Sequence, residues 1–182
     1  MSGAARVESP EAALAADDHV LGDAHAKLTL LEYGDYECPA CIQAEPLMQH
    51  LVEAHRRPLQ FIFRHFPLLE VHPNAELAAE AAEAAAAQGQ FWPMHHLLFA
   101  QAHHLTPTAL PGYAQSLGRD RSRFNAEMTD HIYTQRIQEH RRAGERSGLR
   151  ATPAFFLNSK AVDVSFGFEN LDEAVQAALK MA

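Results

Sequence analysis

The chain has two cysteines, and they stand three residues apart in a Cys-Pro-Ala-Cys stretch at 38–41. A hydrophobic run at 28–33 comes just before this pair, and a segment with helical spacing of apolar residues, 42–55, follows it. A strand that leads through C-x-x-C into a helix is the context in which this spacing indicates a redox-active pair. The pair therefore constrains the fold, because it must stand where a strand turns into a helix.

The first third of the chain predicts a βαβ unit. We expect a strand over residues 27–33, a helix over 38–55 and a second strand over 59–66, whose short apolar run is typical of a buried parallel sheet. Such a unit crosses over with a right hand. Pro46 lies within the expected helix.

The middle of the chain predicts only helices. Two are expected over 74–88 and 91–104. A short helix should follow an N-cap at Thr106-Pro107, and another should follow an N-cap at Asp120, with apolar positions that reach Ile132. A last helix should reach Gly148.

The last part predicts two strands, 154–157 and 161–165, and a final helix that Asn170 and Glu173 begin as a capping box. The fold class is therefore α/β, in the order βαβ, helices, ββα. We expect a flexible N-terminal tail at 1–18, one domain made of 19–72 and 147–182, and a helical insertion at 73–146.

Charge and composition exclude several classes of protein. The net charge is −8, from 15 basic and 23 acidic residues, which argues against a nucleic-acid partner. No stretch approaches the 18 apolar residues that a transmembrane helix needs. The first 21 residues carry four acidic side chains and no apolar signal region, so we expect a cytoplasmic protein; a periplasmic or envelope location is the alternative if a leader has been removed.

The position of the pair at a helix start predicts reactivity. Free backbone N–H groups and the positive end of the helix dipole favour a thiolate there, and such sites lower a cysteine pKa from about 8.5 to between roughly 3.5 and 7.5. Pro39 suits the first helical position. We expect Cys38 to be the exposed nucleophile and Cys41, one turn later, to be the buried resolving thiol.

Two alternatives remain open at this point. The pair could be half of a metal site, for which the 12 histidines supply further ligands, although His95-His96 and His103-His104 are adjacent pairs whose members point to different helix faces. The pair could also be incidental in a binding or chaperone module. We expect no metal and no organic cofactor.

The sequence resembles the DsbA-like thiol–disulfide oxidoreductases of the thioredoxin superfamily. The similarity rests on LLEYGDYECPAC at 30–41, FIFRHFPL at 61–68, the His-Pro pair at 72–73, FWPMHHLLF at 91–99 and TPAFF at 152–156. It covers about residues 18–182. The resemblance implies a thioredoxin fold interrupted by a helical insertion, and the exchange of disulfides with protein or small thiols.

The resemblance also implies roles for single residues. Cys38 matches the attacking cysteine and Cys41 the resolving one. Pro153 matches a cis-proline that binds the substrate backbone, and Thr152 the variable position before it. Glu32 matches a buried acid that accepts a proton from Cys41.

Other features of the resemblance are structural or concern the substrate. Pro46 matches a kink in the active-site helix. We expect further substrate contacts from Tyr36, Pro39 and Ala40. An apolar rim for an unfolded peptide is expected from Tyr33, Tyr36, Pro67, Phe91 and Trp92. The alternative is that the apolar residues near Phe91 mainly form the core between the insertion and the rest of the fold, namely Phe91, Trp92, Leu97, Leu98 and Phe99.

One position departs from the family pattern. DsbA has a histidine where this chain has Ala40, and alanine cannot stabilise the thiolate as that histidine does. We therefore expect a less acidic Cys38 and a less oxidising disulfide than in the strongest oxidants. With a single cysteine pair, the protein needs an external redox partner to reset it. A relative that uses bound glutathione generally lacks the second cysteine, so Cys41 argues against that function.

Overall fold

A five-stranded sheet forms the centre of the computed structural model, which describes residues 15–181. The strand order is β1-β3-β2-β4-β5. The central pair, β2 (Leu28–Gly34) and β3 (Leu59–His65), is parallel, and β4 (Ala154–Leu157) lies antiparallel on the other side of β2. β1 (His19–Gly22) and β5 (Lys160–Val162) form the two edges.

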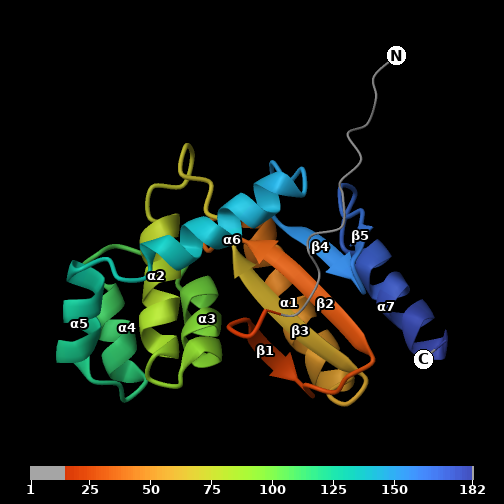
Figure 1. The fold of residues 1–182 in the computed structure, drawn as a ribbon, viewed down its shortest axis with the longest axis horizontal. Coiled ribbons are helices and arrows are strands. Elements are labelled where there is room, and N and C mark those ends of the chain that lie inside the picture. The colour runs from red at the N-terminus through yellow and green to blue at the C-terminus, as the bar shows by residue number, and fades with distance from the viewer. Residues whose placement is uncertain (1–14, 182) are drawn as a thin grey trace.

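Two helices cover one face of the sheet. α1 (Pro39–Ala54) joins β2 to β3 and lies behind the sheet in Figure 1, while α7 (Glu169–Met181) lies beside β4 and β5. Leu30 and Phe63, whose side chains belong to this face, are fully buried in the larger core cluster. Alternation along a strand places their neighbours on the opposite face.

The opposite face has a smaller core, and α6 (Thr134–Arg146) crosses it in front of the sheet in Figure 1. Leu31, Ile62 and Phe156 belong to this cluster. Gly144 lets α6 approach closely, since a Cβ atom there would lie 2.7 Å from the ring of Phe66.

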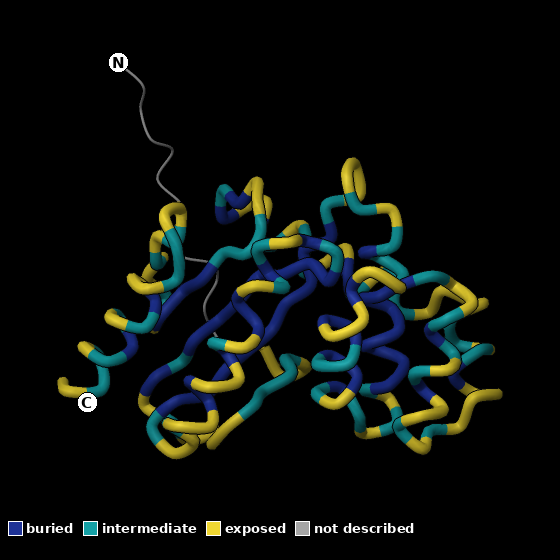
Figure 2. Tube along the Cα trace, turned by 180° about the vertical axis from the view of Figure 1, so that it is seen from behind, coloured by how far each residue is buried: buried dark blue, intermediate teal, exposed yellow. Residues whose placement is uncertain are grey.

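The remaining helices form a block beside the sheet (Figure 1). α2 is the central helix of this block and contacts α3, α5 and α6, because its buried alanines allow close approach. Figure 2 shows buried backbone in the interior of the block and exposed turns at its outer end. The bounds are α2 (Ala75–Ala86), α3 (Phe91–Ala100), α4 (Leu110–Ser116) and α5 (Arg121–Thr129).

The order of elements is the expected one, and the Asn158–Ser159 turn between β4 and β5 has the positive φ angles of a two-residue hairpin loop. Asp120 caps α5 as expected, accepting hydrogen bonds from the N–H groups of Ser122 and Arg123. The boundaries proposed for the insertion, 73–146, stay a prediction.

Several local expectations were wrong. The helix from Phe91 ends at Ala100, not at 104, and α4 begins at Leu110, because the hydroxyl of Thr106 contacts Thr108 and does not cap a helix. α5 ends before the left-handed His131, so Ile132 is exposed.

The C-terminal expectations also need correction. Asn170 lies inside α7 and its amide donates to the carbonyl of Asp163, so the capping box does not form. β5 is shorter than expected and begins one residue earlier, at Lys160. β1 was not predicted, since four residues carry too little pattern to show a strand.

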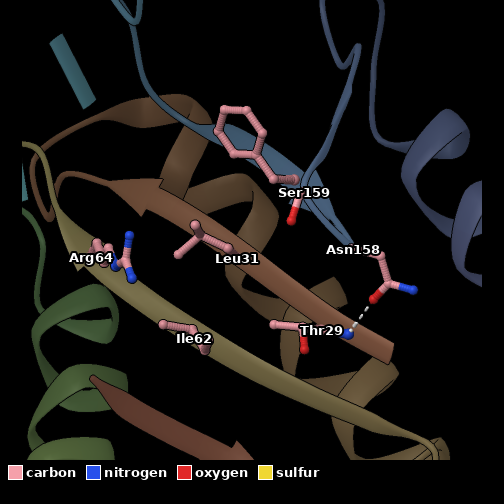
Figure 3. A pocket seen from close by; sticks show the side chains of 7 residues that line it. Thr29, Leu31, Ile62, Arg64, Asn158 and Ser159 are labelled. Carbon is pink, nitrogen blue, oxygen red and sulfur yellow. Dashed lines mark hydrogen bonds between the residues drawn. The ribbon is translucent and has the colours of Figure 1, made fainter. Parts of the chain in front are cut away.

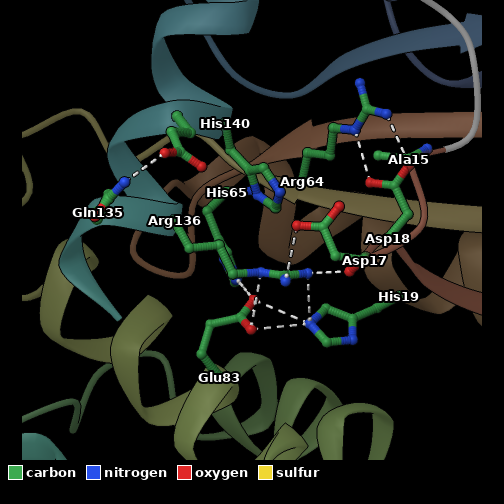
Figure 4. Close-up of polar contacts among 11 residues, drawn as sticks. Ala15, Asp17, Asp18, His19, Arg64, His65, Glu83, Gln135, Arg136 and His140 are labelled. Atoms are coloured by element: carbon green, nitrogen blue, oxygen red, sulfur yellow. Dashed lines mark hydrogen bonds and ion pairs between the residues drawn. The ribbon is translucent and has the colours of Figure 1, made fainter. Parts of the chain in front are cut away.

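Residues 1–14 of the expected tail lie outside the described part of the chain. Within the described part, Asp18 is held by Arg64, whose Nη2 lies 2.7 Å from its carboxylate, and Asp17 contacts Arg136 (Figure 4).

Candidate active site

The cysteine pair lies beyond the C-terminal ends of the parallel strands β2 and β3. Because β4 is antiparallel to β2, with Ala154 opposite Tyr33, the loop before β4 lies at the same end of these strands. The contact is direct, since Sγ of Cys38 lies 3.3 Å from the carbonyl oxygen of Thr152, to which it donates when it is protonated. The fold therefore brings together segments that are 114 residues apart in sequence.

Cys38 is the N-cap residue of α1, with Pro39 in the first turn. A hydrogen bond from the Cys41 thiol is the largest influence lowering the pKa of Cys38 to about 5. The side chain of Thr152 and the backbone N–H groups of Cys41 and Ala40 lower it further, against the opposing effect of burial. This value fits the expected helix-start thiolate. Cys38 is only 6% exposed, less than expected of an exposed nucleophile, because the Thr152 loop covers it.

Cys41 differs from Cys38 in both exposure and acidity. Its side chain is fully buried, and both thiols are free in this structure. Burial raises the pKa of Cys41 well above its usual value, and the hydrogen bond to Cys38 and the charge of Glu32 raise it further. The two thiols thus have opposite shifts, one thiolate and one thiol at neutral pH.

Glu32 lies in the middle of β2, between Phe63 of β3 and Phe155 of β4. It is 1% exposed, and its Oε1 atom has no hydrogen-bond partner among residues 15–181. Burial raises the pKa of Glu32 well above its usual value, and the charges of Glu45 and Cys38 add to this effect. Gly34 leaves room for the carboxyl, since a Cβ there would lie 2.9 Å from Oε1. Glu32 is therefore a buried acid whose Oε1 has no hydrogen-bond partner among the described residues, and its charge interacts with those of both cysteines.

The Thr152–Pro153 peptide bond is cis, the geometry that the resemblance implies. The hydroxyl oxygen of Thr152 is buried; it stabilises the Cys38 thiolate and has no other hydrogen-bond partner among the described residues. Pro39 is exposed and Ala40 half-buried, so both lie at the surface beside the pair. Pro46 lies within α1, and the kink expected there stays a prediction.

Tyr36 does not occupy the position expected of a substrate-binding residue. Its side chain is 1% exposed, and its hydroxyl lies 3.0 Å from Nδ1 of His95. Its ring packs near those of Phe63 and Phe99. Tyr36 is therefore part of the core, because the helical insertion covers it, and the apolar rim does not include its ring.

Asp35 positions the loop before Cys38, a role that the sequence analysis missed. Its Oδ1 accepts from the N–H of Glu37, and its Oδ2 accepts from the N–H of Leu68 and lies 2.7 Å from Nδ1 of His72. The first bond is an Asx turn, a signal that an aspartate just after a strand gives in sequence. Asp35 joins the loop of the cysteine pair to the loop after β3.

Away from the cysteine pair, the molecule has a cluster of possible metal ligands and a hollow on one face of the sheet. Glu45, His95 and His96 place three possible metal-ligand atoms within 4.8 Å of one another. A hollow of about 260 Å³ opens on the sheet face away from α1 (Figure 3). Its lining includes Leu31, Ile62 and Arg64 but no thiol or carboxylate, so it lacks the groups for redox chemistry.

The comparisons with known proteins agree with this architecture. A family model described as thioredoxin matches residues 15–177. A Na⁺/H⁺ antiporter NhaA 1 of Salinispora arenicola is 44% identical over 161 residues, which make up 88% of this chain and 24% of the antiporter. The chain spans about a quarter of the length of the curated relatives it matches.

Solved structures give the same fold. A thioredoxin-like oxidoreductase from Silicibacter pomeroyi is similar with a TM-score of 0.78 and 27% identity, covering 91% of this chain and 94% of that one. Wolbachia pipientis alpha-DsbA1 is similar with a TM-score of 0.80 and 20% identity, covering 96% and 100%.

The predicted α/β fold is thus confirmed. None of the helices between residues 15 and 181 has the length and apolar character needed to cross a membrane. The match over residues 15–177, the element order and the position of the cysteine pair lead to one assignment: the chain belongs to the thioredoxin family.

Proposed function

We propose that the protein is a thiol–disulfide oxidoreductase that acts on protein or small thiols through a mixed disulfide at Cys38. The observation that carries the proposal is that two neighbouring thiols at a helix start have opposite pKa shifts. The pKa of Cys38 is lowered to about 5, and that of Cys41 is raised. This pairing supplies a nucleophile at neutral pH and keeps the second thiol in reserve.

In the reducing direction, the Cys38 thiolate attacks one sulfur of a substrate disulfide, and the other sulfur leaves as a thiolate. Cys41 then loses its proton and attacks Sγ of Cys38, so that the substrate's second thiolate leaves. The substrate gains two electrons, and the protein is left with a Cys38–Cys41 disulfide. An external dithiol partner must reduce this disulfide before the next turnover. The oxidising direction is the reverse sequence.

Glu32 is the proposed proton acceptor for Cys41. Burial raises the pKa of Glu32, which makes its carboxylate a stronger proton acceptor than an exposed one, and its Oε1 has no hydrogen-bond partner within the described chain. Thr152 and Pro153 are the proposed substrate-binding residues, with Pro39 and Ala40 beside them. The hydroxyl of Thr152 lies beside Cys38, where a peptide bound at the thiol would meet it. The chemistry needs no organic cofactor.

The test is the redox equilibrium of the pair in glutathione buffers, read by thiol alkylation and mass spectrometry. We expect a reversible two-electron transition that Cys38→Ser and Cys41→Ser each abolish, and a stable mixed disulfide with substrate only in Cys41→Ser. If no disulfide forms at any glutathione ratio, the proposal fails. Binding of unfolded clients that is unaltered in Cys38→Ser would support the binding module instead.

The measured potential also gives the direction of electron flow. A value of about −120 to −180 mV is typical of oxidants and isomerases and fits an envelope location, whereas a value of about −270 mV is typical of a thioredoxin-type reductase and fits the cytoplasm. Ala40 favours the reducing end of this range.

A further inference from the structure

A cluster of metal-ligand side chains lies between the active-site helix and the helical block. Glu45 extends from α1, and His95 and His96 extend from α3. Glu45 Oε2 lies 3.3 Å from Nε2 of His95, and Glu45 Oε1 lies 2.6 Å from Nδ1 of His96. The adjacent histidines do point in different directions, but they use different ring nitrogens to reach the same carboxylate.

The three possible ligands are held between two helices, with Glu45 and His95 buried and His96 half-buried. The hydroxyl of Tyr36 at Nδ1 of His95 fixes the orientation of the ring, as an outer-shell partner does for a metal-bound histidine. Imidazole nitrogens and carboxylate oxygens are ligands that zinc takes in proteins.

A fourth polar side chain lies beside the three possible ligands. Nε2 of Gln49 donates to Glu45 Oε1 at 2.7 Å and lies 3.2 Å from Nδ1 of His96. When the amide of Gln49 is rotated, its oxygen faces the same space as the carboxylate of Glu45 and can serve as a further ligand.

The distances fit a small transition-metal ion. Ligands at about 2.0–2.1 Å in a tetrahedron lie about 3.3 Å apart, which is the Glu45–His95 separation of 3.3 Å. His96 must retreat from 2.6 Å by less than about 1 Å to match that tetrahedral spacing. It has room to do so, because His96 and Gln49 lie in the wall of an open hollow of about 530 Å³. The hollow also gives an ion access to the cluster.

We propose that Glu45, His95 and His96 form a site for one divalent transition-metal ion of the zinc class, with Gln49 or water in the remaining position. The site joins α1 to α3, so a bound ion fastens the helix that carries both cysteines to the helical block. The cysteines take no part in it, and the proposal is independent of the proposed redox function.

The chain contains a matched control cluster. Glu83 also contacts two histidines, His19 at 3.0 Å and His65 at 2.8 Å. Arg136 lies 3.0 Å from the same carboxylate, and its fixed positive charge opposes a metal ion there (Figure 4). If histidine content alone decided metal binding, both clusters would bind an ion equally well. We expect an ion only at the cluster of Glu45, His95 and His96.

The experiment is a Zn²⁺ titration of the full chain carrying Cys38→Ser and Cys41→Ser, which removes the thiol ligands. Calorimetry should give one ion per chain, and zinc should raise the melting temperature. Adding His96→Ala should weaken binding at least tenfold, whereas adding His19→Ala should leave it unchanged. Circular dichroism checks that each variant folds. Because His96 is half-buried, its loss should spare the fold; Gln49→Ala, at an exposed position, is the second probe and should weaken binding less.

A second measurement identifies the ligands. Co²⁺ bound to the same protein should show the visible spectrum of a low-coordinate nitrogen and oxygen site, and His96→Ala should abolish it. The proposal is overturned if zinc does not bind, if several ions bind with no effect of His96→Ala, or if His19→Ala weakens binding as much as His96→Ala does.

Discussion

The acidity of Cys38 depends on the helix start and on one side chain from a distant loop. The thiol of Cys41, the side chain of Thr152 and the N–H groups of Ala40 and Cys41 all stabilise the Cys38 thiolate. Burial opposes them, so the low pKa is the net effect of hydrogen bonds, most of them from within one helical turn. A low pKa here also matters for leaving-group ability, because an acidic thiol is displaced more easily from a mixed disulfide.

The first prediction concerns the thiol of Cys41 as the main donor. In the wild type, the rate of Cys38 alkylation should titrate with a midpoint near pH 5. A hydrogen bond to a charged group contributes roughly 1.5–3 kcal/mol, so Cys41→Ala should raise the midpoint by about one to two pH units. Cys41→Ser keeps an O–H donor and should shift it less. Alkylation kinetics at single-residue level by mass spectrometry measure this, and equal midpoints in Cys41→Ala and wild type would rule out the thiol as the main donor.

The second prediction separates two effects of Glu32. Glu32→Gln should slow resolution of the mixed disulfide at least tenfold, since a general base contributes about 10²–10⁴. It should also stabilise the fold at neutral pH. A carboxyl whose pKa is raised by folding contributes its full stability below its unfolded pKa and loses it as the pH rises. The gain in melting temperature should therefore be present at pH 7 and absent at pH 4.

The two readouts for Glu32 are independent. A rate of resolution equal to that of the wild type would remove Glu32 from the proton transfer even if the variant is more stable. Unchanged stability at pH 7 would instead show that the carboxyl finds a partner on ionisation.

At the scale of elements, the helical block depends on how its helices begin and end. α5 has nine residues and one buried side chain, Phe124, so its own packing holds it weakly. Its cap is correspondingly important, since Asp120 accepts from two free N–H groups and its backbone N–H donates to Gln88. The helix thus depends on a short-range signal that is visible in the sequence.

The third prediction tests this cap. Asp120→Ala should lower the free energy of unfolding by about 1 kcal/mol. Asp130→Ala, at the C-terminal end of the same helix, is the control and should have no destabilising effect, because a negative charge is unfavourable there. Urea unfolding measures both. Neither variant should change the redox potential of the cysteine pair, which lies on another element.

At the scale of the whole molecule, buried histidines lie at contacts between elements, both between the sheet and a helix and between two helices. His65 of β3 stacks on His140 of α6, and His95 of α3 contacts Glu45 of α1. Burial is the main cause that lowers the pKa of each of these three histidines, and that of His140 falls to about 3. The unfolded chain therefore takes up more protons than the folded one as the pH falls below about 6.5, and stability decreases with it.

The fourth prediction assigns part of this acid sensitivity to His140. A histidine with a pKa of about 3 folded and about 6.5 unfolded loses about 2 kcal/mol of stability between pH 7 and pH 5. His140→Asn should remove most of that pH dependence, whatever it does to stability at pH 7. The exposed His50→Asn on α1 is the control and should retain it. Urea unfolding at the two pH values decides between them.

The sequence by itself determined the cysteine pair, the βαβ unit, the helical block and the final ββα order. These are local patterns: apolar runs, helical spacing, the cap at Asp120 and turn residues such as Asn158. The relation between Cys38 and the helix start was equally local. It could be predicted because the charge effects act within one turn.

The tertiary structure decided what distant segments do to one another. It buried Tyr36 under the helical block, formed β1 by pairing with β3, and placed the Thr152 carbonyl on Cys38. It also brought His95 and His96 to one carboxylate, although adjacent residues on a helix diverge. Such contacts depend on side-chain packing between elements far apart in sequence, and no pattern within a single element records them.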